Sequence, residues 1–233
     1  MTSVKENGTI KLKYTYDSMG RLTREDNAYA NKTYVYEYIT NGNIASKKTY
    51  AYTTGTLGTV QTTETRAYGN SNWLDQLTNI NGTAITYDGM GNPLNWHNAS
   101  AFTWEGRKLK SLTKTDGTVI SYAYDENGIR TGKTAGSENV SYVLDGTKIV
   151  REIRSAYTLT FLYDDSGVLI GFNYNNGTTS ADYYYGIDNW GNINYIYDST
   201  GAVVVTYKYD AWGKAISTTG TLAGTIGAIN PYR

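Results

Sequence analysis

The sequence predicts an all-β protein in which consecutive antiparallel β-hairpins form a long curved or spiralling sheet, a partial shell, with little or no helix. The first observation is a five-residue pattern, Tyr-Asp-x-x-Gly, that recurs along the 233 residues. The second is the alternation of apolar and polar side chains between these copies, which is typical of strands with one buried face. The third is a composition with 24 Tyr, 25 Gly and only 2 Pro, which favours strands and tight turns over helices.

Each copy of the pattern is interpreted as a hairpin turn. The Asp carboxylate can accept hydrogen bonds from backbone N–H groups just downstream, and Gly can adopt the positive φ that a tight turn requires. Six copies keep all three residues, and a seventh has Ile187 in the Tyr position. The predicted turn residues are Tyr16, Asp17, Gly20, Tyr87, Asp88, Gly91, Tyr124, Asp125, Gly128, Tyr163, Asp164, Gly167, Asp188, Gly191, Tyr197, Asp198, Gly201, Tyr209, Asp210 and Gly213.

Strands are expected between these turns in the N-terminal part of the chain. A weaker copy of the pattern is placed at Tyr36, with Glu37 and then Gly42. Residues 53–72 show no strong period and are expected to form a longer loop or a decorated hairpin. The expected strands are residues 9–17, 21–25, 32–38 and 44–52.

The later part of the chain repeats in units of about 20 residues, each with two strands and two turns. The Tyr-Asp turns are predicted at one edge of the sheet and the Asn-Gly or Asp-Gly turns at the other. Residues 214–229 lose the tyrosines, and residues 214–233 are expected to be less regular. No helix is expected in 214–229 because Gly and Thr are frequent there. The clearest expected strands are residues 108–114, 118–124, 157–163, 168–174 and 202–208.

The whole chain, residues 1–233, is interpreted as a single repeat array. Both ends of the sequence look like cuts, so we expect a fragment of a larger protein. The terminal strands of such a fragment would expose unpaired N–H and C=O groups, which could lead to self-association through open sheet edges.

The pattern is followed repeatedly by a basic or polar residue and an aliphatic one, as in Tyr16–Leu22 (YDSMGRL) and Tyr87–Leu94 (YDGMGNPL). This repetition resembles the YD-repeat, or Rhs (rearrangement hotspot), family. The tail from Tyr209 to Lys214, closing at Asn230–Arg233, resembles the last repeats just before that family's core-associated region. The resemblance implies a spiralling β-sheet that winds into a hollow shell, with tyrosines laddered across its strands.

The resemblance also implies a function. It points to a non-enzymatic structural repeat module that forms part of the β-shell of a large bacterial Rhs or wall-associated polymorphic toxin. The expected partner is a C-terminal toxin or passenger domain of the same polypeptide, encapsulated by that shell. The expected location is secreted or at the cell surface or cell wall, with the signal or anchor outside this fragment. Family members that cleave themselves do so at Asp-Pro, and the prolines here follow Asn92 and Asn230, so self-cleavage is not carried over.

Composition argues against several other partners. Lys plus Arg and Asp plus Glu both number 21, and these charges are scattered, so no nucleic-acid partner is expected. No apolar run approaches a membrane span, so no membrane insertion is expected. Cysteine is absent, which removes thiolate metal sites. No cofactor is predicted.

The carboxylates and the one histidine are the candidate groups for catalysis or metal binding. Catalysis would need two carboxylates at a set separation in a cleft, whereas equivalent aspartates beside turn glycines fit turn formation better. Calcium binding by Asp116 or by Asp164-Asp165 is an alternative, although the regular acidic spacing of a calcium loop is missing. His97 stands alone and is expected in a surface or loop position.

Aromatic side chains leave a second function open. Exposed tryptophans and tyrosines can stack against sugar rings, so a carbohydrate- or cell-surface-binding module is the alternative to a shell segment. The competing interpretation is that these rings fill the faces of the sheet. The tryptophans proposed for glycan contact are Trp73, Trp96 and Trp104.

Overall fold

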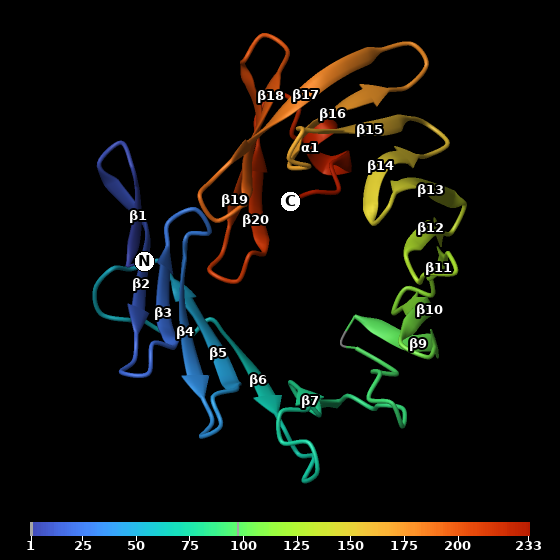
Figure 1. The fold of residues 1–233 in the computed structure, drawn as a ribbon. Coiled ribbons are helices and arrows are strands. Elements are labelled where there is room, and N and C mark those ends of the chain that lie inside the picture. The colour runs from blue at the N-terminus through green and yellow to red at the C-terminus, as the bar shows by residue number, and fades with distance from the viewer. Residues whose placement is uncertain (1, 97) are drawn as a thin grey trace. The chain divides into compact units, whose positions relative to one another are not determined.

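The computed structural model describes residues 2–96 and 98–233, and antiparallel strands make up nearly all of their regular structure (Figure 1). The predicted all-β fold is confirmed. The strands form two sheets, and within each sheet every strand pairs with its neighbours in chain order. An eight-stranded sheet consists of β1 (Ser3–Glu6), β2 (Thr9–Tyr16), β3 (Leu22–Asn27), β4 (Lys32–Tyr38), β5 (Ile44–Ala51), β6 (Thr62–Ala67), β7 (Asn79–Ile80) and β8 (Thr83–Ala84).

A twelve-stranded sheet follows in the same manner. Its strands are β9 (Ala99–Glu105), β10 (Lys108–Lys114), β11 (Val119–Tyr124), β12 (Arg130–Ala135), β13 (Glu138–Asp145), β14 (Lys148–Ile153), β15 (Thr158–Tyr163), β16 (Leu169–Asn175), β17 (Ser180–Ile187), β18 (Ile193–Asp198), β19 (Val203–Tyr209) and β20 (Ala215–Thr219). From β9 to β17 the sheet curves progressively, as strand twist requires of a long antiparallel sheet (Figure 1).

The expectation of one continuous sheet is wrong at the junction between β8 and β9. The described residues there make only isolated bridges, Tyr87 with Pro93 and Trp96 with Ala99. Pro93 has no backbone N–H to donate to a ladder, so regular pairing cannot run through this turn.

The chain divides into two compact units. Unit 1 comprises the described residues up to Ile85 together with Tyr207–Thr218, and unit 2 comprises Thr86–Thr206 with Thr219–Arg233. Unit 1 has a small core of Leu12, Tyr14, Leu22 and Tyr36. The largest fully buried apolar side chains of unit 2 are Leu159, Phe172, Ile196 and Val205.

The stretch expected to be irregular is partly ordered. Residues 53–61 contain no strand, but β6 then pairs with β5 in register from Ser46 opposite Thr65 to Thr49 opposite Thr62. Threonine suits a pleated, half-exposed strand even though β6 lacks the apolar alternation that marks other strands.

Turn positions in unit 2 follow the predicted alternation, with one exception. The turns at Asp125, Asp164 and Asp188 connect β11–β12, β15–β16 and β17–β18, so they lie at one edge of the sheet. The turn at Asp198 connects β18 to β19 and lies at the opposite edge, where the prediction is wrong. Two copies of the pattern about 20 residues apart are separated by two strands, so their turns lie at the same edge. The copy at Tyr197 follows the previous copy, at Ile187, after only one strand, so its turn lies at the other edge.

The C-terminal segment of unit 2 contains a short helix, α1 (Ile226–Ile229), which contradicts the expectation of none in 214–229. Tertiary contacts offset the weak helix propensity. Ile226 is buried, and the Arg233 guanidinium donates to the carbonyl oxygens of Gly227 at 2.7 Å and Ala228 at 3.2 Å. These bonds satisfy carbonyls that a helix end leaves without partners.

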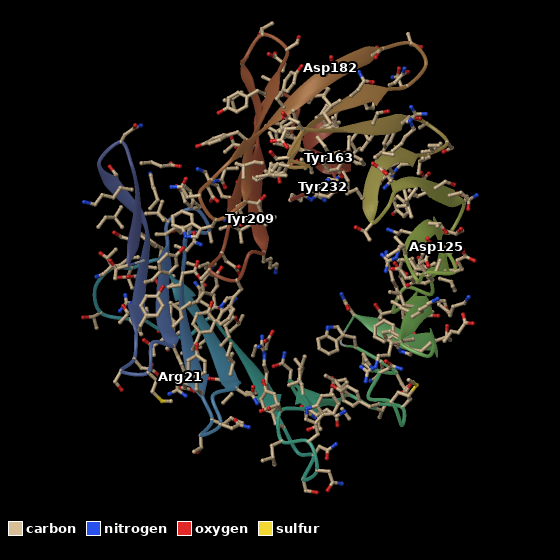
Figure 2. The ribbon with its side chains drawn as sticks, viewed as in Figure 1. Arg21, Asp125, Tyr163, Asp182, Tyr209 and Tyr232 are labelled. Carbon is tan, nitrogen blue, oxygen red and sulfur yellow. The ribbon has the colours of Figure 1, made fainter. Side chains whose placement is uncertain are left out.

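The same segment packs on one face of the sheet of unit 2. The Tyr185 hydroxyl donates to Asn230 Oδ1 at 2.6 Å, and Asn230 is only 1% exposed. The Tyr232 ring meets Phe161 edge-on at 5.0 Å and lies beside Tyr163 (Figure 2). Burial, followed by a hydrogen bond with Tyr163, raises the pKa of the Tyr232 hydroxyl, so this phenol stays protonated in its contact.

Candidate functional site

The predicted turn residues form seven turns with the same hydrogen bonds. In each, the Gly N–H donates to the Asp carbonyl at 2.9 to 3.1 Å, and the Asp N–H donates to the carbonyl four residues later at 2.9 to 3.0 Å. The Asp Oδ1 accepts the N–H of that fourth residue at 2.7 to 3.0 Å. Each Gly has φ between 77° and 86°, a conformation that costs Gly little and other residues more.

Hydrogen bonds keep these carboxylates ionised where a pKa shift is resolved. The backbone N–H and then the guanidinium of Arg21 lower the pKa of Asp17. The side chain and backbone of Asn92 lower that of Asp88, and the Thr200 hydroxyl does the same for Asp198. Each of these aspartates is thus engaged by its own turn, as a backbone-organising group would be.

The weaker copy placed at Tyr36 is wrong by two residues. The turn starts at Tyr38, because the Ile39 N–H donates to the Asn43 carbonyl and the Gly42 N–H donates to the Ile39 carbonyl, both at 2.9 Å. This backbone turn therefore forms without an aspartate. The tyrosines alternate along β4, so the sequence does not indicate which of them begins the turn.

Tyrosines at or just after the C-terminal end of a strand make hydrogen bonds with the neighbouring strand. Four hydroxyls donate to a backbone carbonyl there, and in each case the acceptor directly precedes a bulged residue. A bulge interrupts the ladder of backbone hydrogen bonds, and the tyrosine hydroxyl donates to the carbonyl at that interruption. We call this contact the tyrosine clasp. The clasps are Tyr38 to Leu22 at 2.6 Å, Tyr68 to Ile44 at 3.1 Å, Tyr124 to Leu109 at 2.9 Å and Tyr163 to Ile149 at 2.9 Å.

A basic side chain covers three of these four tyrosine rings. Arg21 lies 4.7 Å from the Tyr38 ring centre, Lys148 lies 5.3 Å from that of Tyr163, and Lys108 lies 6.0 Å from that of Tyr124. Each cation directly precedes the acceptor residue of its clasp. In these three clasps the basic residue that follows a turn contacts the tyrosine ring, and the next, aliphatic residue accepts the hydrogen bond of its hydroxyl. Phe would supply only the ring for the contact with the cation, which explains why this pattern uses Tyr.

We expect Tyr124→Phe to lower the free energy of unfolding by about 1 kcal/mol, because the Leu109 carbonyl loses its hydrogen-bond donor. Urea unfolding with an unchanged m-value measures the difference. Tyr184→Phe is the matched control, since its ring is 40% exposed and its hydroxyl has no partner among the described residues. Equal stability of the two variants would contradict a stabilising role for the clasp.

A second set of contacts lies within unit 1, where the turn Tyr209–Lys214, here the docked turn, meets strands β3 to β5. The Ala211 N–H donates to Glu25 Oε1 at 3.2 Å, and Lys47 Nζ lies 3.8 Å from Asp210 Oδ2. The Trp212 ring meets Tyr36 edge-on at 5.6 Å. Beside them, Lys208 pairs with Glu6 and lies 4.6 Å from the Tyr29 ring centre.

Glu25 is the buried centre of this contact. It is 0% exposed, and it accepts hydrogen bonds from Asn27 Nδ2 at 2.8 Å and from the Tyr36 hydroxyl at 3.4 Å. Burial raises the pKa of the Glu25 carboxyl, and the negative charge of Asp210 acts in the same direction, while Asn27, Ala211 and Lys47 oppose it. The sequence placed Asp210 in a turn, but nothing in it marked Glu25.

The tryptophans predicted for glycan contact do not all belong to one unit. Trp73 belongs to unit 1 and is 50% exposed. Trp96 and Trp104 belong to unit 2, and the Trp104 indole N–H donates to the Pro93 carbonyl at 2.7 Å, which gives this ring a structural contact. Glycan contact stays a prediction. His97 lies outside the described residues.

Residues 2–96 and 98–233 contain no group of three or more His, Cys, Asp or Glu side chains that could hold a metal ion. Asp116 Oδ1 instead accepts the Thr118 N–H at 2.8 Å within its own turn. None of the helices described there is long and apolar enough to cross a membrane.

Comparisons with known proteins agree with this repeat structure. The tRNA3(Ser)-specific nuclease WapA of Bacillus spizizenii is 31% identical over 154 residues, and the tRNA nuclease WapA of Bacillus subtilis is 32% identical over 154 residues. Each match covers 63% of this chain and 6% of the relative, so the chain spans a small part of the length of these proteins.

Among solved structures, TcdB2-TccC3 without its hypervariable C-terminal region is matched with 14% identity and a TM-score of 0.49, covering 96% of this chain and 16% of that one. The family model described as teneurin YD-shell matches residues 2–224, nearly the whole sequence. The predicted membership of the YD-repeat group is thereby confirmed. This chain belongs to the teneurin YD-shell family.

Proposed function

We propose that this module is a non-enzymatic wall segment of a β-shell that encloses a passenger domain of the same polypeptide. The observation that carries the proposal is the family match over residues 2–224, together with the repeated turns and the four clasps between neighbouring strands. Such an array extends by adding hairpins and needs no separate core for each unit. Residues 1–233 would then be one stretch of a longer array.

The relatives support a passenger of the toxin class. Two of them are named as tRNA nucleases, and this chain matches 6% of their length. We therefore place any nuclease or other toxic activity outside the module, in the part of the polypeptide that it would enclose. A secreted or cell-wall location belongs to the same proposal.

The course of the C-terminal segment adds a physical argument. Tyr232 packs against Phe161, and Asn230 bonds with Tyr185 on the same face of β15–β17. A polypeptide joined to Arg233 would therefore begin on the face that carries these aromatic side chains. Aromatic rings with a polar end can contact an unfolded or folded passenger without requiring one specific sequence.

Limited proteolysis of the full-length polypeptide tests enclosure. We expect sites in the sequence that follows the module to be cleaved roughly tenfold or more slowly in the full-length protein than in the same segment produced alone, because a protease reaches enclosed sites only when the shell opens. Sites in an unrelated folded domain fused to the opposite end serve as the control. Equal cleavage rates in the full-length protein and the isolated segment would rule out enclosure.

A further inference from the structure

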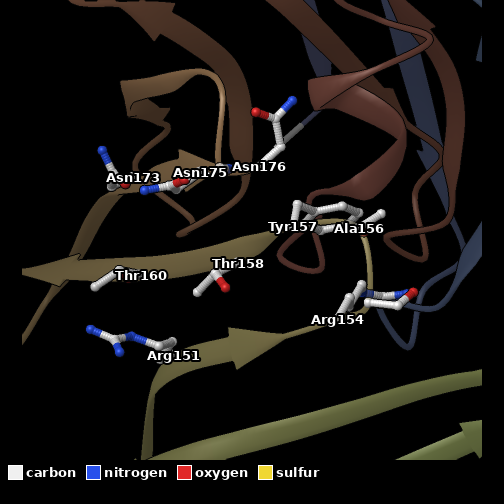
Figure 3. Close-up of a pocket in the computed structure, with 11 residues that line it drawn as sticks. Arg151, Arg154, Ala156, Tyr157, Thr158, Thr160, Asn173, Asn175 and Asn176 are labelled. Atoms are coloured by element: carbon white, nitrogen blue, oxygen red, sulfur yellow. Dashed lines mark hydrogen bonds between the residues drawn. The ribbon is translucent and has the colours of Figure 1, made fainter.

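A polar groove of about 510 Å³ lies over β14, β15 and β16 in unit 2 (Figure 3). Arg151, Thr160 and Asn173 lie opposite one another across these three strands. They face away from Leu159 and Phe161, because successive side chains of a strand point to opposite faces. The groove is therefore on the face of this sheet that the C-terminal segment leaves uncovered.

The hydrogen bonds of two asparagines fix which of their atoms remain available to a ligand. Asn175 Oδ1 accepts the Gly177 N–H at 2.8 Å. Asn176 Oδ1 accepts the N–H groups of Thr178 at 3.0 Å and Thr179 at 2.7 Å. A backbone N–H can only donate, so these bonds assign the oxygens to the turn and leave both Nδ2 amides as donors without a partner among the described residues.

The positive charge of the groove is also unbalanced. The Arg154 guanidinium pairs with Glu152 at 2.6 Å and with Glu138 at 3.7 Å. Arg151 is exposed, and its guanidinium has no hydrogen bond or ion pair with any residue that the structure describes. The nearby acid Asp182 already accepts a hydrogen bond from Asn173 Nδ2 at 2.7 Å.

We propose that this groove binds an oxyanion, a carboxylate or phosphate group carried on a small hydroxylated ligand. The Arg151 guanidinium presents a planar set of donors that matches either anion. The Asn175 and Asn176 amides would donate to further oxygens of the same ligand, with the Thr158 and Thr160 hydroxyls between them. The volume lies within the range of about 300–1,000 Å³ found for small-molecule sites, and the proposal is independent of the enclosure of a passenger.

The size of the ligand follows from the sheet. Adjacent strands are about 4.8 Å apart, so the β14 and β16 walls of the groove are separated by roughly 10 Å. One oxyanion alone cannot contact Arg151 and the asparagine amides together. A ligand of the size of a sugar acid or a sugar phosphate can reach both.

Heteronuclear NMR titration of this chain with sodium glucuronate, glucose 6-phosphate and neutral glucose tests the proposal. We expect glucuronate, glucose 6-phosphate or both to shift the side-chain amide signals of Asn175 and Asn176 saturably, while glucose does not. Arg151→Gln is expected to weaken that binding by roughly tenfold or more, with unchanged backbone signals elsewhere. Lys114→Gln is the matched control, since it removes one exposed positive charge of unit 2 outside the groove and should leave binding unchanged.

The pattern of ligands distinguishes the two anions. Binding of glucuronate alone assigns the site to a carboxylated sugar, and binding of glucose 6-phosphate assigns it to a phosphorylated ligand. Three results would overturn the proposal: no saturable shift with either anion, equal affinity for glucose, or an affinity that Arg151→Gln leaves unchanged.

Discussion

Phe172→Ala is expected to lower the stability of unit 2 by about 3–5 kcal/mol, a large part of the total for an ordinary domain. Phe172 is 0% exposed, and its ring lies 5.5 Å from that of Tyr183 and 5.6 Å from that of Tyr185. Truncation leaves a cavity and removes the aromatic partner of both tyrosines. Hydrogen exchange of the amides of β15 to β17 measures the loss, because it reports on this unit separately from the other.

Ile170→Ala is the control for this substitution. Ile170 lies on the same strand but is 38% exposed, so its truncation is expected to cost less than about 1 kcal/mol. Amides of β3 and β4 in unit 1 provide an internal reference in both variants. If Phe172→Ala lowered stability no more than Ile170→Ala, the sheet would not depend on its buried aromatic face.

Local signals in the sequence predict the hairpins well. The expected strand at 108–114 coincides with β10 (Lys108–Lys114), and that at 32–38 coincides with β4 (Lys32–Tyr38). These elements could be predicted because alternation, turn glycines and turn aspartates act over a few residues. A repeat also supplies several independent observations of the same turn.

Contacts between distant segments could not be predicted in this way. The docked turn meets Glu25 across 186 positions of sequence, and neither residue carries a local mark of that partnership. The clasp lies between these two cases. Where it has a cation, the acceptor and the cation are the aliphatic and basic residues that follow a turn, so part of it is visible in the sequence. Its geometry depends on a bulge, which shifts pairing by one residue and leaves little trace in the alternation.

Glu25→Ala is expected to destabilise unit 1 by removing the acceptor of three buried or half-buried donors. Asn27 Nδ2, the Tyr36 hydroxyl and the Ala211 N–H would each lose a partner, at a cost of about 1–3 kcal/mol for each donor left unsatisfied. The docked turn should then separate from β3, and amide exchange at Ala211 and Trp212 should accelerate with that of β3. Ser46, Lys47 and their neighbours on β5 report whether the sheet itself remains folded.

Glu25→Gln separates the charge of this residue from its shape. Because burial raises the pKa of the Glu25 carboxyl, the folded state holds its proton at pH values where the unfolded chain has released it. The contribution of Glu25 is therefore full below its ordinary pKa and is lost as the pH rises through the raised value. The stability of the wild-type chain minus that of Glu25→Gln should fall with rising pH over this window.

The difference between the two proteins is the informative quantity, because other carboxylates act in the opposite direction. Hydrogen bonds from Lys48 and then from Ser46 lower the pKa of Glu37, so its stabilising contribution is lost on acidification. This loss is the same in both proteins and cancels in the difference between their stabilities. Urea unfolding of the pair across mildly acidic to neutral pH provides the measurement. A difference that rises with pH, or none at all, would mean that the Glu25 carboxyl is ionised in its contact with the docked turn. The hydrogen bonds from Asn27 and Ala211, together with the charge of Lys47, would then offset the burial of Glu25 and the charge of Asp210.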